Sequence, residues 1–98
     1  MEKVIVQFSI PGMTSKMYDQ IWDELRQAGQ SHPEGLHHHV GAQQGENWLV
    51  VDVWESMEAF NKFGETLMPI LAKAGVNMDS AKPVITPVYY ELDPALVH

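Results

Sequence analysis

The two segments Leu36-His37-His38-His39-Val40 and Trp48-Leu49-Val50-Val51-Asp52-Val53-Trp54 decide the fold of this chain. Each has the length and composition of a β-strand, and the turn dipeptide Gln44-Gly45 lies between them, so together they predict a hairpin. Side chains alternate between the two faces of a strand. The second segment is apolar on both faces, with Trp48, Val50 and Trp54 opposed to Leu49, Val51 and Val53. Such a strand is typical of a sheet that is covered on both sides.

The remaining segments complete the order strand, helix, strand, strand, helix, strand. The predicted elements are a strand over 3–10, a helix from Thr14 or Ser15 to about 28, strands over 36–43 and 47–54, a helix over 56–75 and a last strand over 84–92. Pro69 removes a backbone donor from the second helix, which predicts a kink or a restart there. Pro87 cannot donate to a ladder, which predicts that the last strand lies at a sheet edge or carries a bulge.

This order predicts a ferredoxin-like α+β fold, in which two helices cover one face of a four-stranded antiparallel sheet. We expect a single domain over residues 1–98. The helices leave the second sheet face open, although the strand over 47–54 is apolar on that face too. An apolar sheet face of this size is most simply buried against the same face of another copy. The pattern therefore predicts a homodimer that packs through the sheet face.

Composition excludes several classes of function. Thirteen acidic residues against six basic ones give a formal charge of −7, and the basic residues form no cluster, which disfavours nucleic-acid binding. No apolar run approaches the roughly 20 residues of a membrane span. There is no cysteine, hence no disulfide and no thiol nucleophile. The first residues alternate like a strand rather than forming a signal peptide, so we expect a soluble cytoplasmic protein.

The run from Val51 to Phe60, Val-Asp-Val-Trp-Glu-Ser-Met-Glu-Ala-Phe, resembles a known superfamily, the dimeric α/β-barrel proteins. It is most similar to the antibiotic biosynthesis monooxygenase-like families, whose third strand ends in an aromatic residue followed by an acidic-Ser pair and Glu-Ala. The matching residues are Trp54, Glu55, Ser56, Glu58 and Ala59. The resemblance implies a homodimeric barrel with a pocket between sheet and helices. It further implies a monooxygenase, a cyclase or an isomerase that works without a tightly bound organic cofactor.

The hairpin also predicts where titratable groups meet. If Gln44-Gly45 is a two-residue turn, Gln43 pairs with Glu46 and Asp52 lies opposite His37, while His39 shares their face. His37 or His39 is then the candidate general base and Asp52 the group that orients it. Acting on an aromatic or polyketide-like substrate, such a site would abstract a proton before oxygenation or rearrangement.

Three alternatives remain open. The histidines are structural or surface residues of a strand, or two of them bind iron or zinc together with Asp52. The third alternative is a non-catalytic ligand-binding or stress-response module of the same fold. Whether the chain is an enzyme or a binding module, a small hydrophobic or aromatic ligand suits its aromatic residues. The candidate substrate-binding residues are Tyr18, Trp22, Trp54, Phe63, Met68 and Tyr89.

Overall fold

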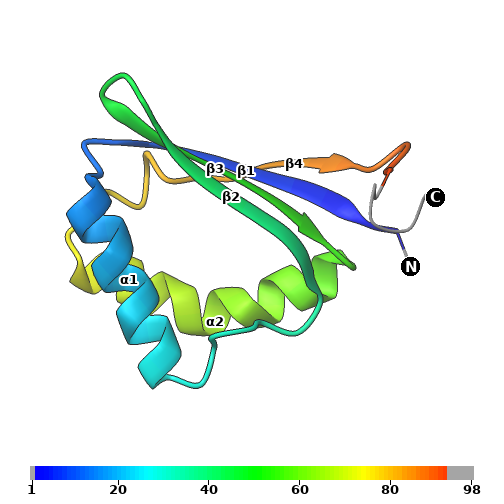
Figure 1. The fold of residues 1–98 in the computed structure, drawn as a ribbon, viewed down its shortest axis with the longest axis horizontal. Helices are drawn as coiled ribbons and strands as arrows, with labels where there is room; N and C mark the ends of the chain where they lie inside the picture. Colours follow the sequence, from blue (N-terminus) through cyan, green and yellow to red (C-terminus); the bar gives the residue numbers. More distant parts are fainter. Residues whose placement is uncertain (1, 93–98) are drawn as a thin grey trace.

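Six secondary-structure elements make up the fold in a computed structural model that describes residues 2–92. They are β1 (Val4–Pro11), α1 (Ser15–Gln27), β2 (Leu36–Gln44), β3 (Asn47–Trp54), α2 (Met57–Lys73) and β4 (Val84–Pro87). The strands form one antiparallel sheet in the order β2-β3-β1-β4. Both helices lie on the same face of this sheet (Figure 1). The predicted βαββαβ order and ferredoxin-like fold are confirmed.

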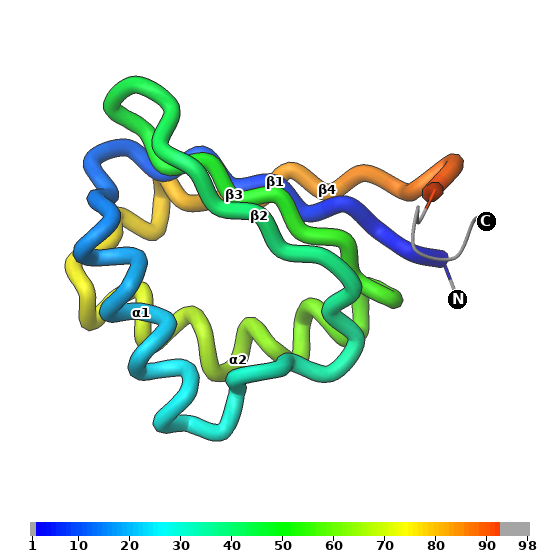
Figure 2. The backbone as a smooth tube through the Cα atoms, in the orientation of Figure 1, coloured from blue at the N-terminus to red at the C-terminus, as the bar shows by residue number. Residues whose placement is uncertain are grey.

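The core lies between the sheet and the two helices (Figure 2). Every second residue of β1 and β3 points into it, as the alternation predicts, and these residues are all buried. From the helices, α1 contributes Ile21 and Leu25, and α2 contributes Phe60, Phe63 and Leu71. Spacings of three, four and eight residues keep each set on one helix face. The inward residues of the two central strands are Val4, Val6, Phe8, Ile10, Trp48, Val50, Asp52 and Trp54.

Both helices begin within one residue of their predicted starts, each directly after a capping residue. The Thr14 hydroxyl accepts a hydrogen bond from the Met17 amide at 3.2 Å, and the Ser56 hydroxyl accepts one from the Ala59 amide at 3.1 Å. These bonds satisfy amides that have no partner inside the helix. Helix α2 runs through Pro69 as one element, so the predicted restart at this residue does not occur.

Strand β4 lies at the edge of the sheet, as Pro87 predicts, but it is shorter than expected. Its residues pair with β1 from Val84 to Pro87, and the prediction that the strand continues to residue 92 is wrong. After Pro87, a single further backbone bond joins the Val88 amide to the Lys3 carbonyl at 3.0 Å. Proline at the strand end cannot extend the ladder, because it has no N–H to donate.

The β2–β3 hairpin turns one residue later than predicted. Gly45 and Glu46 form the turn and Gln44 pairs with Asn47, so the expected pairing of Gln43 with Glu46 is wrong. Gly45 has a φ of +61° and no other residue type has a positive φ among the described residues. Glycine therefore stands first in the turn, as in a type II′ hairpin, rather than second as in type I′. From His38 to Gln44, each β2 residue consequently meets a β3 partner two positions further along than predicted, which leaves its face unchanged.

The connection between α1 and β2 runs alongside α2 (Figure 2), and Gly35 in this connection lies close to Ala59 of α2. A Cβ atom at Gly35 would lie 2.6 Å from the Ala59 Cβ, and the φ of +87° is one that side chains disfavour. Gly29 has nearly the same φ, +81°, but a Cβ there would meet nothing within 4 Å.

These two glycines make a matched pair for a stability test. We expect Gly29→Ala to cost about 1–2 kcal/mol, the strain of the left-handed backbone alone. Gly35→Ala should cost roughly 1–3 kcal/mol more, because the new methyl group overpacks against Ala59. Urea unfolding followed by circular dichroism measures both free energies. Equal losses in the two variants would show that the contact with α2 is not tight.

Candidate functional site

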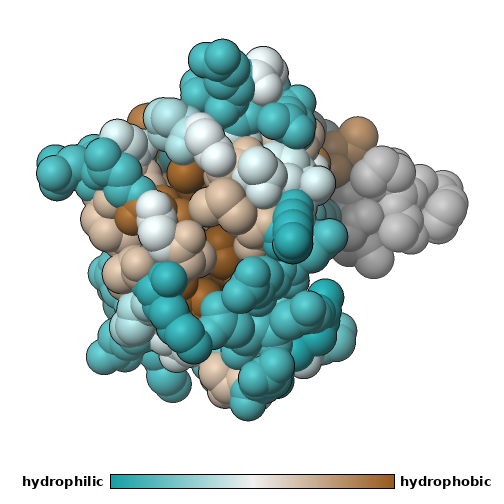
Figure 3. Space-filling model, turned by 90° about the vertical axis from the view of Figure 1, so that its left-hand side faces the viewer, coloured by the Kyte–Doolittle hydropathy of each residue, from teal (hydrophilic) through white to brown (hydrophobic). Residues whose placement is uncertain are grey.

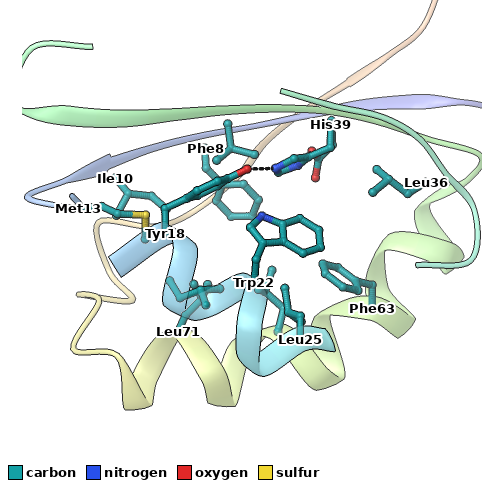
Figure 4. Close-up of a pocket in the computed structure, with 14 residues that line it drawn as sticks. Phe8, Ile10, Met13, Tyr18, Trp22, Leu25, Leu36, His39, Phe63 and Leu71 are labelled. Atoms are coloured by element: carbon teal, nitrogen blue, oxygen red, sulfur yellow. Dashed lines mark hydrogen bonds and ion pairs between the residues drawn. The ribbon is translucent and has the colours of Figure 1, made fainter. Parts of the chain in front are cut away.

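His39 on β2 lies between Asp52 and Tyr18, and both of its ring nitrogens are engaged. Its Nδ1 is 2.5 Å from the Asp52 Oδ1, and its Nε2 is 2.5 Å from the Tyr18 hydroxyl oxygen (Figure 4). The other carboxylate oxygen of Asp52 accepts a hydrogen bond from the Trp54 indole N–H at 3.2 Å. These four side chains form one hydrogen-bonded chain, Tyr18–His39–Asp52–Trp54.

The sheet places three members of this chain. His39 pairs with Asp52 across the β2–β3 ladder, so the two side chains lie directly opposite each other on the inner face. Trp54 follows Asp52 by two residues and therefore projects from the same face. His37 is the extra residue of a bulge, because Leu36 pairs with Trp54 and His38 with Val53.

The fourth member, Tyr18, reaches the sheet from α1 because Gly41 has no side chain. A Cβ atom at Gly41 would lie 2.8 Å from the Tyr18 hydroxyl oxygen. The phenol ring crosses β2 over this gap, nearly parallel to the His39 ring at an interplanar angle of 7°. It also packs against Trp48, with ring centroids 4.9 Å apart. Helix and strand thus meet at the hydroxyl of Tyr18.

Asp52 sets the protonation pattern of the chain. It is a buried carboxylate with 5% exposure, and an unpartnered charge at such a place would be costly. Each of its oxygens has one N–H donor, from His39 and from Trp54. The network thereby assigns the proton of the neutral imidazole to Nδ1, which leaves Nε2 as an acceptor for the Tyr18 O–H.

The hydrogen-bonded chain opens onto a cavity of about 50 Å³ between the sheet and both helices. Tyr18, His39, Asp52 and the indole N–H of Trp22 supply its polar groups, and the rest of the wall is apolar (Figure 4). The volume corresponds to on the order of four water molecules. Seen from the α1 side, apolar surface gathers in a hollow that polar side chains surround (Figure 3). The site therefore combines titratable groups with apolar surroundings.

A second, polar cleft of about 260 Å³ lies between the α1–β2 connection and α2. His32, Glu34 and Lys62 line it, and Phe63 lines both this cleft and the apolar cavity. Phe63 thus forms part of the wall between a polar outer space and an apolar inner one.

Burial raises the pKa of the Tyr18 hydroxyl above its usual value. A hydrogen bond from the Trp22 side chain acts in the opposite direction, and the carboxylates of Asp52 and Asp19 add to the rise. Tyr18 therefore stays protonated at neutral pH and acts as the donor to His39.

The structure brings together some of the predicted site residues and separates others. The cavity wall contains His39, Asp52, Tyr18, Trp22 and Phe63. Trp54 is fully buried and lies behind Asp52, outside the cavity lining.

Three predicted residues lie elsewhere. His37 is exposed at the bulge, so the expected pairing of His37 with Asp52 is wrong and His39 takes that place. Met68 does not line the cavity. Tyr89 follows the end of β4 and is fully exposed, so it contributes nothing to the cavity wall. Sequence reasoning missed the bond between Tyr18 and His39, for which the only local signal is the glycine at position 41.

The described residues offer no cluster of metal ligands. Between residues 2 and 92, no three His, Asp or Glu side chains lie close enough together to hold a metal ion. His37 and His39 thus do not combine with Asp52 into the two-histidine, one-carboxylate group that the sequence allowed. In the same range no helix is both long and apolar enough to cross a membrane.

Several solved structures share this fold. A protein assigned as an antibiotic biosynthesis monooxygenase from Chloroflexus aurantiacus J-10-fl aligns with a TM-score of 0.64, over 93% of this chain and 97% of its own, at 15% sequence identity. SnoaB, a cofactor-independent oxygenase from Streptomyces nogalater, aligns with a TM-score of 0.56 over 96% of this chain and 98% of its own, at 13% identity. The chain thus has the ferredoxin-like fold of antibiotic biosynthesis monooxygenase-like proteins, as its sequence predicts. No family model matches the sequence, and no curated protein does either.

The raised pKa of Tyr18 predicts how stability depends on pH. The folded protein holds the hydroxyl proton more tightly than the unfolded chain, whose tyrosine pKa is about 10. This contribution to the free energy of unfolding is therefore complete below about pH 10 and is lost as the pH rises towards the folded pKa. Tyr18→Phe should abolish that part of the decline, and Tyr89→Phe, at an exposed site, should keep it. Urea titrations of the three proteins at several alkaline pH values provide the measurement; parallel profiles would contradict it.

Proposed function

We propose that this protein is a small-molecule enzyme that opens its reaction by proton transfer in the apolar cavity. The observation that carries the proposal is a histidine hydrogen-bonded to a buried carboxylate in the wall of an otherwise apolar cavity. The substrate is small and hydrophobic or aromatic, and no tightly bound organic cofactor is required. In this reading His39 is the base that finally holds the proton, and Asp52 orients it.

The chemistry of the pair supports this role. Histidine changes charge near neutral pH, so it can accept and return a proton during turnover. The Asp52 carboxylate stabilises the imidazolium that forms, because the two groups are already paired at 2.5 Å. Apolar walls exclude water and strengthen these electrostatic interactions.

A monooxygenase-like outcome is consistent with this first step. Proton abstraction from an activated methylene group leaves a carbanion that dioxygen, as the co-substrate, can oxidise. The methylene becomes a carbonyl, one oxygen atom enters the product and the other leaves as water, so that no external reductant is needed. SnoaB, which is described as a cofactor-independent oxygenase, shares the fold. At this low identity the likeness supports the reaction class by analogy only.

A ligand-binding module without catalysis is the alternative, and the small volume of the cavity favours it. Only a compact molecule fits about 50 Å³ unless the wall at Phe63 moves. Catalysis and simple binding differ in what Asp52 must do, because only catalysis needs a carboxylate that stabilises a transient positive charge.

The test uses cyclopentanone, a compact apolar ketone with acidic α-protons, whose exchange into D2O is followed by NMR. We expect the protein to accelerate exchange, and His39→Gln and Asp52→Asn to lose about 100-fold or more of that rate. His37→Gln is the matched control at the exposed bulge and should keep the full rate. Exchange by the unmodified protein no faster than in buffer, or full activity of His39→Gln, would contradict the proposal.

We further propose that the protein is a homodimer that packs through the outer face of the sheet. Across this face Val40 lies beside Val51, and Val53 lies beside Ile5. Val40 is 61% exposed in a single copy, which is unusual for an aliphatic residue within a strand. Burial of this patch against a second copy would give the two-sided covering that the sequence of β3 calls for.

A charge in the middle of the patch tests the dimer. Val51→Lys should raise the dissociation constant of the dimer at least 10-fold, because a lysine there would be buried without a partner. Asn61→Lys, at an exposed position of α2, adds the same charge outside the patch and should leave association unchanged. Sedimentation equilibrium over a range of concentrations reports both values. If the wild-type protein is still monomeric at about 100 µM, any dimer is weaker than common homodimers, and that result would contradict the proposed dimer.

A further inference from the structure

We infer that Tyr18 exchanges the proton with the substrate, and that His39 receives it through the Tyr18 hydroxyl rather than directly. The inference rests on the proposed function, since it takes the His39–Asp52 pair as the base. It changes which atom meets the substrate, and it narrows the substrate to molecules that suit a phenolic oxygen.

The first argument is that His39 has no free nitrogen. A general base must present a lone pair to the proton that it removes. The Nδ1 of His39 faces the Asp52 carboxylate, and the lone pair of Nε2 faces the Tyr18 hydroxyl at 2.5 Å. A substrate can reach Nε2 only by displacing Tyr18, which Trp48 on one side holds in place. Trp22 packs edge-on against the imidazole ring, with centroids 5.0 Å apart.

The second argument is that the Tyr18 oxygen remains able to bind. A tyrosine hydroxyl has one proton to donate and retains acceptor capacity on its oxygen. Its proton points to His39, and one of the two lone pairs on its oxygen accepts from the Trp22 side chain, which leaves the other for a group in the cavity that Tyr18 lines. Figure 4 shows the hydroxyl at the inner end of the phenol ring, against His39 and above Trp22.

The proton step balances without any further reactant. The acidic C–H or O–H bond of the substrate breaks as a new O–H bond forms on Tyr18. The original Tyr18 proton moves to Nε2 of His39. The resulting imidazolium is paired with Asp52, and the substrate anion accepts a hydrogen bond from the new Tyr18 hydroxyl. Reversal of the same movements returns the proton to the substrate or product. No electrons are transferred in this step.

This geometry favours one substrate class. The substrate group beside the Tyr18 oxygen must carry an acidic proton. Once this group is an anion, it must accept a hydrogen bond from the Tyr18 hydroxyl, as the anion of an enolisable ketone or of a phenol does. The apolar walls favour the flat, uncharged form of such a molecule before the step. Because burial raises the pKa of Tyr18, the hydroxyl is not a free phenolate at rest, and it passes a proton on as it takes one.

Two substitutions test the relay with the same cyclopentanone exchange assay. Tyr18→Phe should lose about 100-fold or more of the exchange rate, as His39→Gln does. The double variant should be no worse than either single one, because residues that act as a unit are not additive. Tyr89→Phe, the matched control at a fully exposed tyrosine, should keep the wild-type rate.

Gly41→Ala breaks the relay while keeping all of its chemical groups. The new methyl group would lie 2.8 Å from the Tyr18 oxygen, so the end of that flexible side chain must move away from His39. We expect at least a 10-fold loss of exchange with an unchanged circular dichroism spectrum. Gly64→Ala on α2, where a Cβ meets nothing within 4 Å, is the matched control and should retain the rate.

Replacement of Tyr18 by 3-fluorotyrosine distinguishes a catalytic hydroxyl from one that only positions His39. The hydrogen bond is kept, but the hydroxyl becomes more acidic, so a proton-transferring group should change the exchange rate several-fold. An unchanged rate would overturn the relay. Wild-type exchange by Tyr18→Phe with an inactive His39→Gln would also overturn it while leaving the proposed function intact. No acceleration by the unmodified protein would overturn both.

Discussion

The buried carboxylate of Asp52 is the constraint on which the arrangement of the site depends. A charge taken out of water needs hydrogen-bond donors, and the apolar core offers few of them. Trp54 supplies one from two residues further along the same strand, and His39 supplies the other from the neighbouring strand. The second bond couples the carboxylate to the pairing of β2 with β3. A slip of one residue would move His39 to the other face and leave Asp52 short of a donor.

The same bond links the sheet to the helix that covers it. Because the Nδ1–H of His39 donates to Asp52, the lone pair on Nε2 faces α1, where Tyr18 can donate to it. Tyr18 in turn needs a strand that lets its ring approach closely, which Gly41 provides. The polar chain thus crosses the core from β3 through β2 to α1. Such a network, with every member partnered, also favours one docking of helix on sheet over slightly shifted ones.

Much of the fold followed from local rules. Alternation in β1 and β3 predicts which side chains are buried, and the caps at Thr14 and Ser56 predict where the helices begin. The face that Asp52 shares with a histidine was also predictable, because a two-residue error in pairing preserves the face. Which histidine pairs with Asp52 was not predictable, because Gln44-Gly45 allows the glycine to stand first or second in the turn. Only the observed backbone, with φ of +61° at Gly45, decides between the two.

The role of Tyr18 lay beyond sequence reasoning, since it depends on how α1 docks across β2. Helical periodicity places Tyr18 beside the buried stripe of α1 but says nothing about which strand it meets. Tyr89 shows the converse. Its aromatic ring suggested a place in the pocket, yet the last strand ends at Pro87 and leaves it in solvent.

The missing side chain at Gly41 has a consequence for how relatives of this protein should be sorted. Fold similarity at 15% identity or below groups proteins whose sites have little in common. A pattern drawn from the site is more selective: His39-x-Gly41 on one strand, Asp52-x-Trp54 on the next, and a tyrosine early in the first helix. A homologue that keeps the histidine and the aspartate but has a bulky residue at the glycine position would have no room for the phenol. It would present a bare imidazole to its ligand, and the size of one residue would then separate two chemistries on one scaffold.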